Sequence, residues 1–174
     1  GLGDTAQDAE VWRYNGTRWT LVGGDGVNSS WSAASNIEQV LSLSYFGGNL
    51  YAGVGLTAGD GDVWRFNGTS WTQIGGDGLN SGWAASTYEV VPALTNDGTN
   101  LYAGVGNSNG DGEVFRWNGS AWTKIGGDGV SSSFSSNQGD GVYALEYSGS
   151  TLYTGLYDAA GNGTVWTYTG STWS

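Results

Sequence analysis

The chain contains neither histidine nor cysteine, so any chemistry must come from its carboxylates, amides, hydroxyls and aromatic rings. Without those two residue types, a Ser-His-Asp triad, a Cys-His pair and a histidine-based zinc site are excluded. Paired carboxylates can catalyse glycoside hydrolysis. A catalytic pair, however, normally occupies one asymmetric cleft, whereas the carboxylates of this chain recur at a regular interval. We therefore expect no enzymatic activity.

Pairs of acidic residues occur three times at equivalent positions, and a fourth position has Asn162 and Thr164 instead. Alternating oxygen ligands around glycine suit a hard cation such as calcium. The candidate calcium ligands are Asp8, Glu10, Asp60, Asp62, Asp111 and Glu113. Each pair offers two carboxylates, whereas calcium takes about 6 to 8 oxygens, so the favoured interpretation is that Asp-Gly builds a turn. We expect no cofactor, with calcium as the alternative.

A longer stretch after each Gly-Gly-Asp-Gly string is the best candidate for ligand binding. Loops longer than about 12 residues are uncommon in compact domains and are often functional. An aromatic ring beside amide and carboxylate oxygens can hold a sugar, because the ring covers C–H groups and the oxygens accept from hydroxyls. Alternatively, the ring fills the space between neighbouring sheets and the aspartate caps the turn. The candidate sugar-binding residues are Trp31, Trp83, Phe134, Asp25, Asp77, Asp128, Asn28 and Asn80.

The candidate sites recur because the chain contains an internal repeat of about 51 residues. The segment 11–17 recurs at 63–69 and 114–120, and more weakly at 165–171. A tryptophan keeps the same interval, at Trp19, Trp71, Trp122 and Trp173. Self-similarity at a fixed period of about 20 to 50 residues is the signature of repeat architectures.

The sequence pattern of each repeat unit predicts four short strands. The expected ranges are 90–94 for a first strand, 101–105 for a second, 63–66 for a third and 71–74 for a fourth. An Asn-Gly pair between the third and fourth strands predicts a tight hairpin with positive φ at both residues. The third strand places Trp64 and Phe66 on one face and Val63 with the stem of Arg65 on the other. A strand that is apolar on both faces belongs to a sheet between two other sheets.

The repeat resembles that of the kelch-like β-propellers. The segment 50–55, Leu-Tyr-Ala-Gly-Val-Gly, is similar to their glycine-bearing second strand, and Phe66 followed by Trp71 is similar to their Tyr-then-Trp pair. The resemblance implies an all-β fold, a β-propeller of four-stranded antiparallel blades, and the repeat length gives about three and a half blades per chain. It implies no binding residues. The expected single repeat domain divides into a partial blade over 1–31 and blades over 32–83, 84–134 and 135–174.

Charge and composition exclude several partners. The net charge is −11 and the chain has 5 Lys and Arg residues, too few to neutralise a nucleic-acid backbone or to bind an anionic membrane. The chain has no apolar run of about 18 residues that would span a bilayer. Low lysine with abundant Gly, Asn, Ser and Thr favours an extracellular or cell-surface location.

Two classes of non-enzymatic function remain. The first is an extracellular binding module for glycans, with one weak lectin-like site per blade strengthened by multivalency. The second is a structural subunit of an extracellular filament, sheath or surface assembly, or a truncated or designed propeller completed by oligomerisation. Because the chain begins and ends inside a unit, we expect exposed sheet faces and edges that pair with other copies of the chain. A compact four-bladed monomer is the alternative to such a homo-oligomer.

Overall fold

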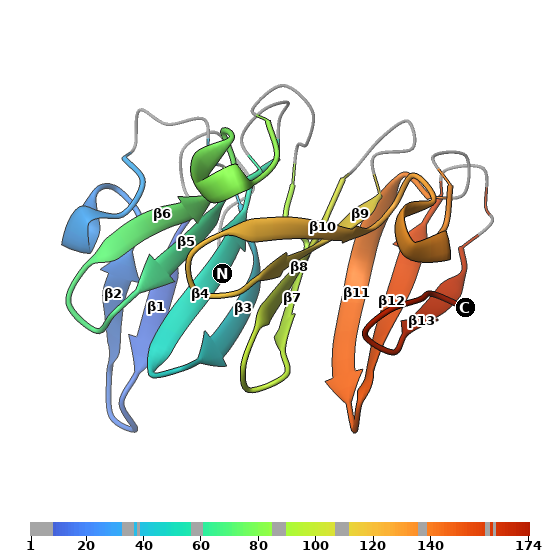
Figure 1. Cartoon of the computed structure of the whole chain (residues 1–174). Helices are drawn as coiled ribbons and strands as arrows, with labels where there is room; N and C mark the ends of the chain where they lie inside the picture. The colour runs from blue at the N-terminus through green and yellow to red at the C-terminus, as the bar shows by residue number, and fades with distance from the viewer. Residues whose placement is uncertain are drawn as a thin grey trace.

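Antiparallel sheets follow one another along the chain in the computed structural model (Figure 1). The structure describes residues 9–32, 37, 39–56, 61–84, 90–106, 112–135, 139–158, 161 and 163–174. Within these residues the strands form four sheets, which we number in chain order. The first sheet pairs β1 with β2, the second has the order β3-β4-β5-β6, the third β7-β8-β9-β10 and the fourth β11-β12-β13.

The strand bounds repeat from sheet to sheet. The first and second sheets contain β1 (Val11–Tyr14), β2 (Trp19–Gly23), β3 (Val40–Phe46), β4 (Asn49–Val54), β5 (Val63–Phe66) and β6 (Trp71–Gly75). The third and fourth contain β7 (Ala93–Asn96), β8 (Leu101–Val105), β9 (Glu113–Trp117), β10 (Trp122–Gly126), β11 (Gly141–Ser148), β12 (Thr151–Tyr157) and β13 (Val165–Tyr168). Short 3-10 turns follow the fourth strand of a unit at η1 (Val27–Ser29), η2 (Leu79–Ser81) and η3 (Val130–Ser132). None of the helical segments in the described part of the chain is long and apolar enough to cross a membrane.

The predicted second and third strands agree with β8 and β5, and the fourth extends one residue further, to Gly75. The prediction for the first strand, 90–94, was wrong, because β7 begins at Ala93. Pro92 explains the shift, since proline has no N–H to donate to a ladder. The residues before it pair with the second sheet instead: Val90 bridges Gly55, and the Val91 N–H donates to the carbonyl of Val54 at 3.2 Å. The chain thereby joins two consecutive sheets.

The Asn-Gly hairpins also differ from the expectation. Gly68 has a φ of 97°, but Asn67 is not among the residues with positive φ, so the turn is not the type predicted. The Asn67 side-chain oxygen instead accepts from the backbone N–H groups of Thr69 and Ser70, both at 2.9 Å. Asparagine is therefore used here because its side-chain oxygen accepts the hydrogen bonds that close the turn, and not because it tolerates positive φ.

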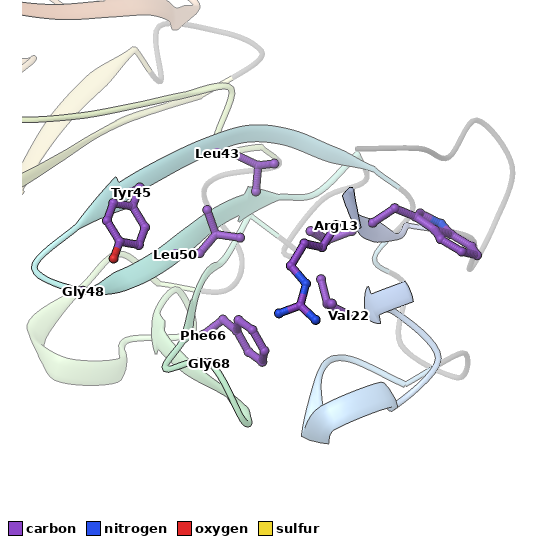
Figure 2. Close-up of a pocket in the computed structure, with 10 residues that line it drawn as sticks. Arg13, Val22, Leu43, Tyr45, Gly48, Leu50, Phe66 and Gly68 are labelled. Atoms are coloured by element: carbon purple, nitrogen blue, oxygen red, sulfur yellow. The ribbon is translucent and has the colours of Figure 1, made fainter. Parts of the chain in front are cut away.

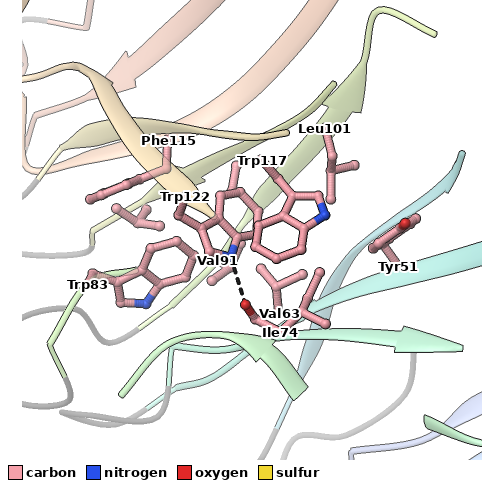
Figure 3. Close-up of a cluster of buried hydrophobic side chains, with 11 residues drawn as sticks. Tyr51, Val63, Ile74, Trp83, Val91, Leu101, Phe115, Trp117 and Trp122 are labelled. Carbon is pink, nitrogen blue, oxygen red and sulfur yellow. Dashed lines mark hydrogen bonds between the residues drawn. The ribbon is translucent and has the colours of Figure 1, made fainter. Parts of the chain in front are cut away.

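Successive sheets pack face to face and bury apolar residues between them. The alternation predicted for the third strand is confirmed: Trp64 and Phe66 pack against the cluster shared with the first sheet, whereas Val63 packs toward the third. Equivalent clusters fill the space between the second and third sheets (Figure 3) and between the third and fourth. Each inner sheet is therefore apolar on both faces and depends on a neighbour on either side.

A tryptophan fixes the spacing between consecutive sheets. The indole N–H groups of Trp71, Trp122 and Trp173 donate to carbonyl oxygens of the preceding sheet at 2.7, 2.8 and 2.7 Å; for Trp122 the acceptor is Ile74, as Figure 3 shows. The ring of Trp122 lies on Gly75, where a Cβ atom would come within 2.7 Å of the indole nitrogen. Glycine is therefore required under the ring, because any side chain would push the sheets apart.

The sheets form a row whose ends lie far apart. Figure 1 shows the first sheet at one end and the fourth at the other, and β3, β7 and β11 contact one another in series. No strand pairing among the described residues joins the first sheet to the fourth, so these residues show an all-β row of sheets and not a closed ring.

Replacing Trp122 with Phe tests this inter-sheet contact. The variant removes one of the two donors to the Ile74 carbonyl and leaves that of Asn80, so we expect the free energy of unfolding to fall by about 1 kcal/mol, the net contribution of one hydrogen bond. Urea denaturation followed by circular dichroism measures the change. Thr123→Ala, on the exposed face of the same strand, is the control and should change stability by less than about 0.5 kcal/mol. Equal effects of the two variants would contradict the role given to the indole.

Candidate functional site

The aromatic residues predicted to hold a sugar lie in the interior. Trp31, Trp83 and Phe134 are all buried, with at most 3% of their surface exposed. Each packs against the next sheet: Trp83, for example, contacts Phe115 at 5.0 Å and Trp122 at 5.4 Å between ring centroids. Its indole N–H donates to the carbonyl of Gly61, again inside the core. The rings therefore fill the space between sheets and present no free face on which a sugar could stack.

The polar members of the same predicted site shape the turn. Asp25, Asp77 and Asp128 have φ values of 53°, 53° and 51°, the left-handed region that Asp and Asn tolerate better than most residues. Asn28 and Asn80 also have positive φ, and their amide groups donate back to the carbonyls of Val22 and Ile74 at 3.1 and 3.0 Å. The asparagines are thus committed to closing the loop, and the structure does not bring them together with an exposed ring.

The predicted calcium ligands are only partly visible. Asp8, Asp60 and Asp111 lie outside the described residues, while Glu10 is half-buried and Asp62 and Glu113 are buried. Among the described residues, no three His, Cys, Asp or Glu side chains come close enough together to hold a metal ion. The described part of the predicted site therefore does not provide a set of ligands for a cation.

One of these acids is instead part of an ion-pair network. Lys124 contacts the Glu113 carboxylate at 2.6 Å and the Asp128 carboxylate at 3.0 Å. Burial lowers the pKa of Lys124, but the hydrogen bonds to both carboxylates outweigh burial and raise it above its ordinary value. The hydrogen bond from Lys124 lowers the pKa of Asp128. Because Gln73 occupies the equivalent position in the second sheet, the network belongs to the third sheet and ties its outer strand to the loop that follows.

Exposed apolar residues gather at the first end of the row. Trp12, Tyr14 and Trp19 of the first sheet are exposed, and so are Leu43 and Tyr45 of β3 in the second sheet. We call this surface the leading face, defined by these five residues. Large exposed apolar patches mark interaction sites.

A groove of about 310 Å³ runs through the leading face (Figure 2). Leu43, Tyr45 and Leu50 line it from the second sheet, and Arg13 and Val22 from the first. It lies where the described first sheet has two strands and the second has four, so that β3 and part of β4 extend beyond β1. The groove is lined mainly by apolar side chains.

The opposite end of the row has a second exposed surface. Tyr153 and Val165 of the fourth sheet are exposed, and both line a shallow hollow together with Ala144, Glu146 and Gly155. We call the surface formed by these five residues the trailing face. It is the side of the fourth sheet that points away from the third.

Comparisons with known proteins add no family. The chain matches no protein-family model, and no curated protein matches it. The assignment of a site therefore depends on the two end faces and their relation to the repeat.

The sequence predicted that some sheet faces are exposed, but it did not identify the residues that form the leading and trailing faces. The repeat contained a signal: a residue equivalent to a buried core position of the inner sheets is exposed where no described sheet packs on it. Val165, for example, is equivalent to Val63 and Val114.

Replacing Lys124 with Met tests the ion-pair network. The variant leaves Glu113 buried without its ammonium, so we expect a loss of about 1–3 kcal/mol in the free energy of unfolding at neutral pH. The raised pKa of Lys124 stabilises the fold below the ordinary lysine pKa of about 10.4, and this contribution is lost as pH rises through the folded-state pKa. The lowered pKa of Asp128 contributes above about pH 3.9 and is lost as pH falls through its folded-state value.

The difference between wild type and Lys124→Met should therefore be largest between about pH 5 and 9 and shrink at both extremes. Chemical denaturation across this range measures it. Asp128→Asn is the control, because an exposed ion pair contributes about 0–1 kcal/mol. A difference that does not depend on pH would contradict the network.

Proposed function

We propose that this chain is a non-enzymatic β-propeller module of the kelch-like type whose function is to bind other copies of itself through its leading and trailing faces. The observation that carries the proposal is the contrast between equivalent residues inside the row and at its ends. Val63 and Val114 are 0% exposed, whereas Val165 is 73% exposed. Tyr51 and Tyr102 are 4% and 5% exposed, whereas Tyr153 is 42% exposed.

The end faces have the composition of an interior contact. Sheets of this repeat bury valine and tyrosine against the next sheet, and the trailing face displays the same two residue types in the same register. The leading face displays tryptophan, tyrosine and leucine, as the buried faces of the second and third sheets do. Two copies meeting end to end would therefore repeat a contact that each copy already makes internally.

Glycine positions support the same conclusion. A Cβ atom on Gly53 would overlap Val91 of the next sheet, and one on Gly104 would overlap Val142. At the equivalent Gly155, the Cβ of Ala144, on the neighbouring strand of the same sheet, is the only atom of the described residues that would lie within 4 Å of an added Cβ. Within the described part of the chain, no sheet approaches Gly155 as one approaches Gly53 and Gly104.

Self-association fits the structure better than glycan binding, because the rings that would hold a sugar are buried between sheets. The extracellular or cell-surface location remains the prediction made from composition. The proposed product is a homo-oligomer, either a closed ring or a filament, built by heterologous contacts between unlike faces.

Replacing Tyr45 with Ser tests the leading face. Tyr45 is 71% exposed in the single chain, so the variant should fold normally but weaken self-association at least about tenfold, as expected for an aromatic contact at the centre of an interface. Sedimentation equilibrium over a range of concentrations measures the affinity. Leu79→Ser removes an exposed apolar residue of η2, away from both faces, and should leave the affinity unchanged. A wild-type mass that stays at 18.1 kDa at all concentrations would overturn the proposed function.

Replacing Gly155 with Ala tests the trailing face. The added methyl group would come 3.3 Å from the Cβ of Ala144, a tight contact, so the free energy of unfolding of the monomer should fall by about 1–2 kcal/mol, less than for a methyl group that overlaps its neighbour. Self-association should be strongly weakened, because the equivalent methyl groups at Gly53 and Gly104 would overlap the following sheet. Gly104→Ala is the matched comparison and should destabilise the monomer more strongly. Unchanged association of Gly155→Ala would show that no sheet packs on this face.

A further inference from the structure

We infer that the hairpin tips of the first three sheets are acceptor sites for N-linked glycans. The sites are Asn15, Asn67 and Asn118, each followed by Gly and then by Thr or Ser. This is the Asn-x-Ser/Thr pattern of N-glycosylation acceptors, in which x is any residue except proline. Asn162 has the same pattern but lies outside the described residues. Such a modification is independent of self-association through the end faces.

The three asparagines lie at exposed turns between the third and fourth strands of a unit, which are β1–β2, β5–β6 and β9–β10. A Cβ atom added to the next residue, Gly16, Gly68 or Gly119, would meet no atom of the described residues within 4 Å. The tips are therefore surrounded by open space. A bulky, soluble group attached there would extend into solvent and would not enter the space between sheets.

The asparagine side chains present the reactive nitrogen outward. Each Oδ1 atom accepts from two backbone N–H groups of its own turn, whereas within the described residues none of the three Nδ2 groups donates a hydrogen bond. The hydroxyl groups of Thr17 and Ser120 donate to the Oδ1 atoms of Asn15 and Asn118 at 2.8 and 3.0 Å. The hydroxyl that the acceptor pattern requires thus lies beside the amide, and the nitrogen remains free.

The turn does not need this nitrogen. In the fourth sheet Thr169 replaces the asparagine, and its N–H still donates to the carbonyl of Thr172 at 3.4 Å. Gly170 has a φ of 99°, close to the 97° of Gly68. A turn of this shape therefore also forms without asparagine, whose amide nitrogen has no part in closing it.

The co-substrate is an oligosaccharide activated as a lipid-linked pyrophosphate. A bond forms between Nδ2 and the anomeric carbon of the sugar, and the bond from that carbon to the phosphate oxygen breaks. The pyrophosphate carrier leaves with the electron pair, and one Nδ2 proton passes to a base of the transferase. The atoms and electrons balance without a redox step, and the chain contributes only the acceptor.

Asn28 has the same sequence pattern, because Ser30 follows two residues later, but its environment differs. Its amide donates to the carbonyl of Val22 at 3.1 Å. The hydroxyl of Ser30 is buried and accepts from the N–H of Gly24 at 2.8 Å, so it does not serve the amide. A glycan on Asn28 would oppose the closing of this loop. The folded protein should therefore carry glycans at the hairpin tips and none at Asn28.

Secretion of the full chain from a eukaryotic cell line tests the assignment, because that route supplies the transferase and the activated oligosaccharide. Enzymatic removal of the glycans in heavy-oxygen water, followed by peptide mass spectrometry, gives the occupancy of each asparagine. We expect glycans at Asn15, Asn67 and Asn118 and none at Asn28 in the secreted protein. Tips without glycans, or equal occupancy at Asn28, would overturn the assignment.

A threonine variant separates the acceptor pattern from the turn. Thr69→Ala removes the hydroxyl but keeps Asn67 and the backbone N–H of residue 69, which donates to Asn67 at 2.9 Å. We expect the glycan at Asn67 to be lost while the circular dichroism spectrum stays unchanged. Thr72→Ala, at an exposed position of β6 in the same hairpin, is the control and should keep all glycans. Retention of the glycan in Thr69→Ala would overturn the assignment of Asn67.

A gain of modification at the fourth tip gives an independent measurement. Thr169→Asn supplies the missing amide before Gly170 and Ser171 and completes the acceptor pattern. The secreted variant should carry one more glycan than the wild type. Thr169→Gln supplies an amide without the pattern and should gain none. If Thr169→Asn gains no glycan, exposed hairpin tips of this shape are not acceptors, and the inference is overturned while the proposed self-association stands.

Discussion

The structure depends on the contact between the faces of consecutive sheets. A sheet with apolar residues on both sides cannot be stable alone, because each face must be covered by another element. Here the covering element is the next repeat of the same sheet, and the indole of Trp71, Trp122 or Trp173 joins the two through a hydrogen bond to a buried carbonyl. The glycine beneath each ring sets how closely the sheets approach. Stability therefore accumulates from one sheet to the next, as in other repeat proteins.

Much of this arrangement was predictable from the sequence. The spacing of the tryptophans revealed the repeat, and alternation in 63–66 showed that both faces of the third strand are buried. The first strand was misplaced because Val90 and Val91 look like strand residues, and only the structure shows that they pair with the preceding sheet. The Asn-Gly turns were misread because asparagine serves two purposes in turns, and sequence does not distinguish a positive φ from a side-chain acceptor.

The candidate site was harder to predict, for a physical reason. Trp83, Asp77 and Asn80 have the side chains that a sugar site needs. The same residue types also serve a structural purpose, because a tryptophan can fill the space between two sheets and Asp and Asn can form a tight turn. What separates the two is whether another sheet lies over the ring, and that depends on residues of the next repeat unit. The residues of the end faces were hard to predict for the converse reason: Tyr153 and Val165 have the residue types of core positions, and only the structure shows that no described sheet packs on them.

Terminal units of repeat proteins usually require a polar outer face for solubility. The leading and trailing faces do not have one, since Tyr45 and Val165 are the most exposed large apolar residues among those the structure describes. The net charge of −11 opposes association of like chains, but this repulsion is screened within about 10 Å at ordinary salt, whereas apolar contact acts where the faces touch. The two faces lie at opposite ends of the row of described sheets in Figure 1, so neither covers the other. In the self-association that we propose, a second copy would meet each face with residue types that already pack together between the inner sheets.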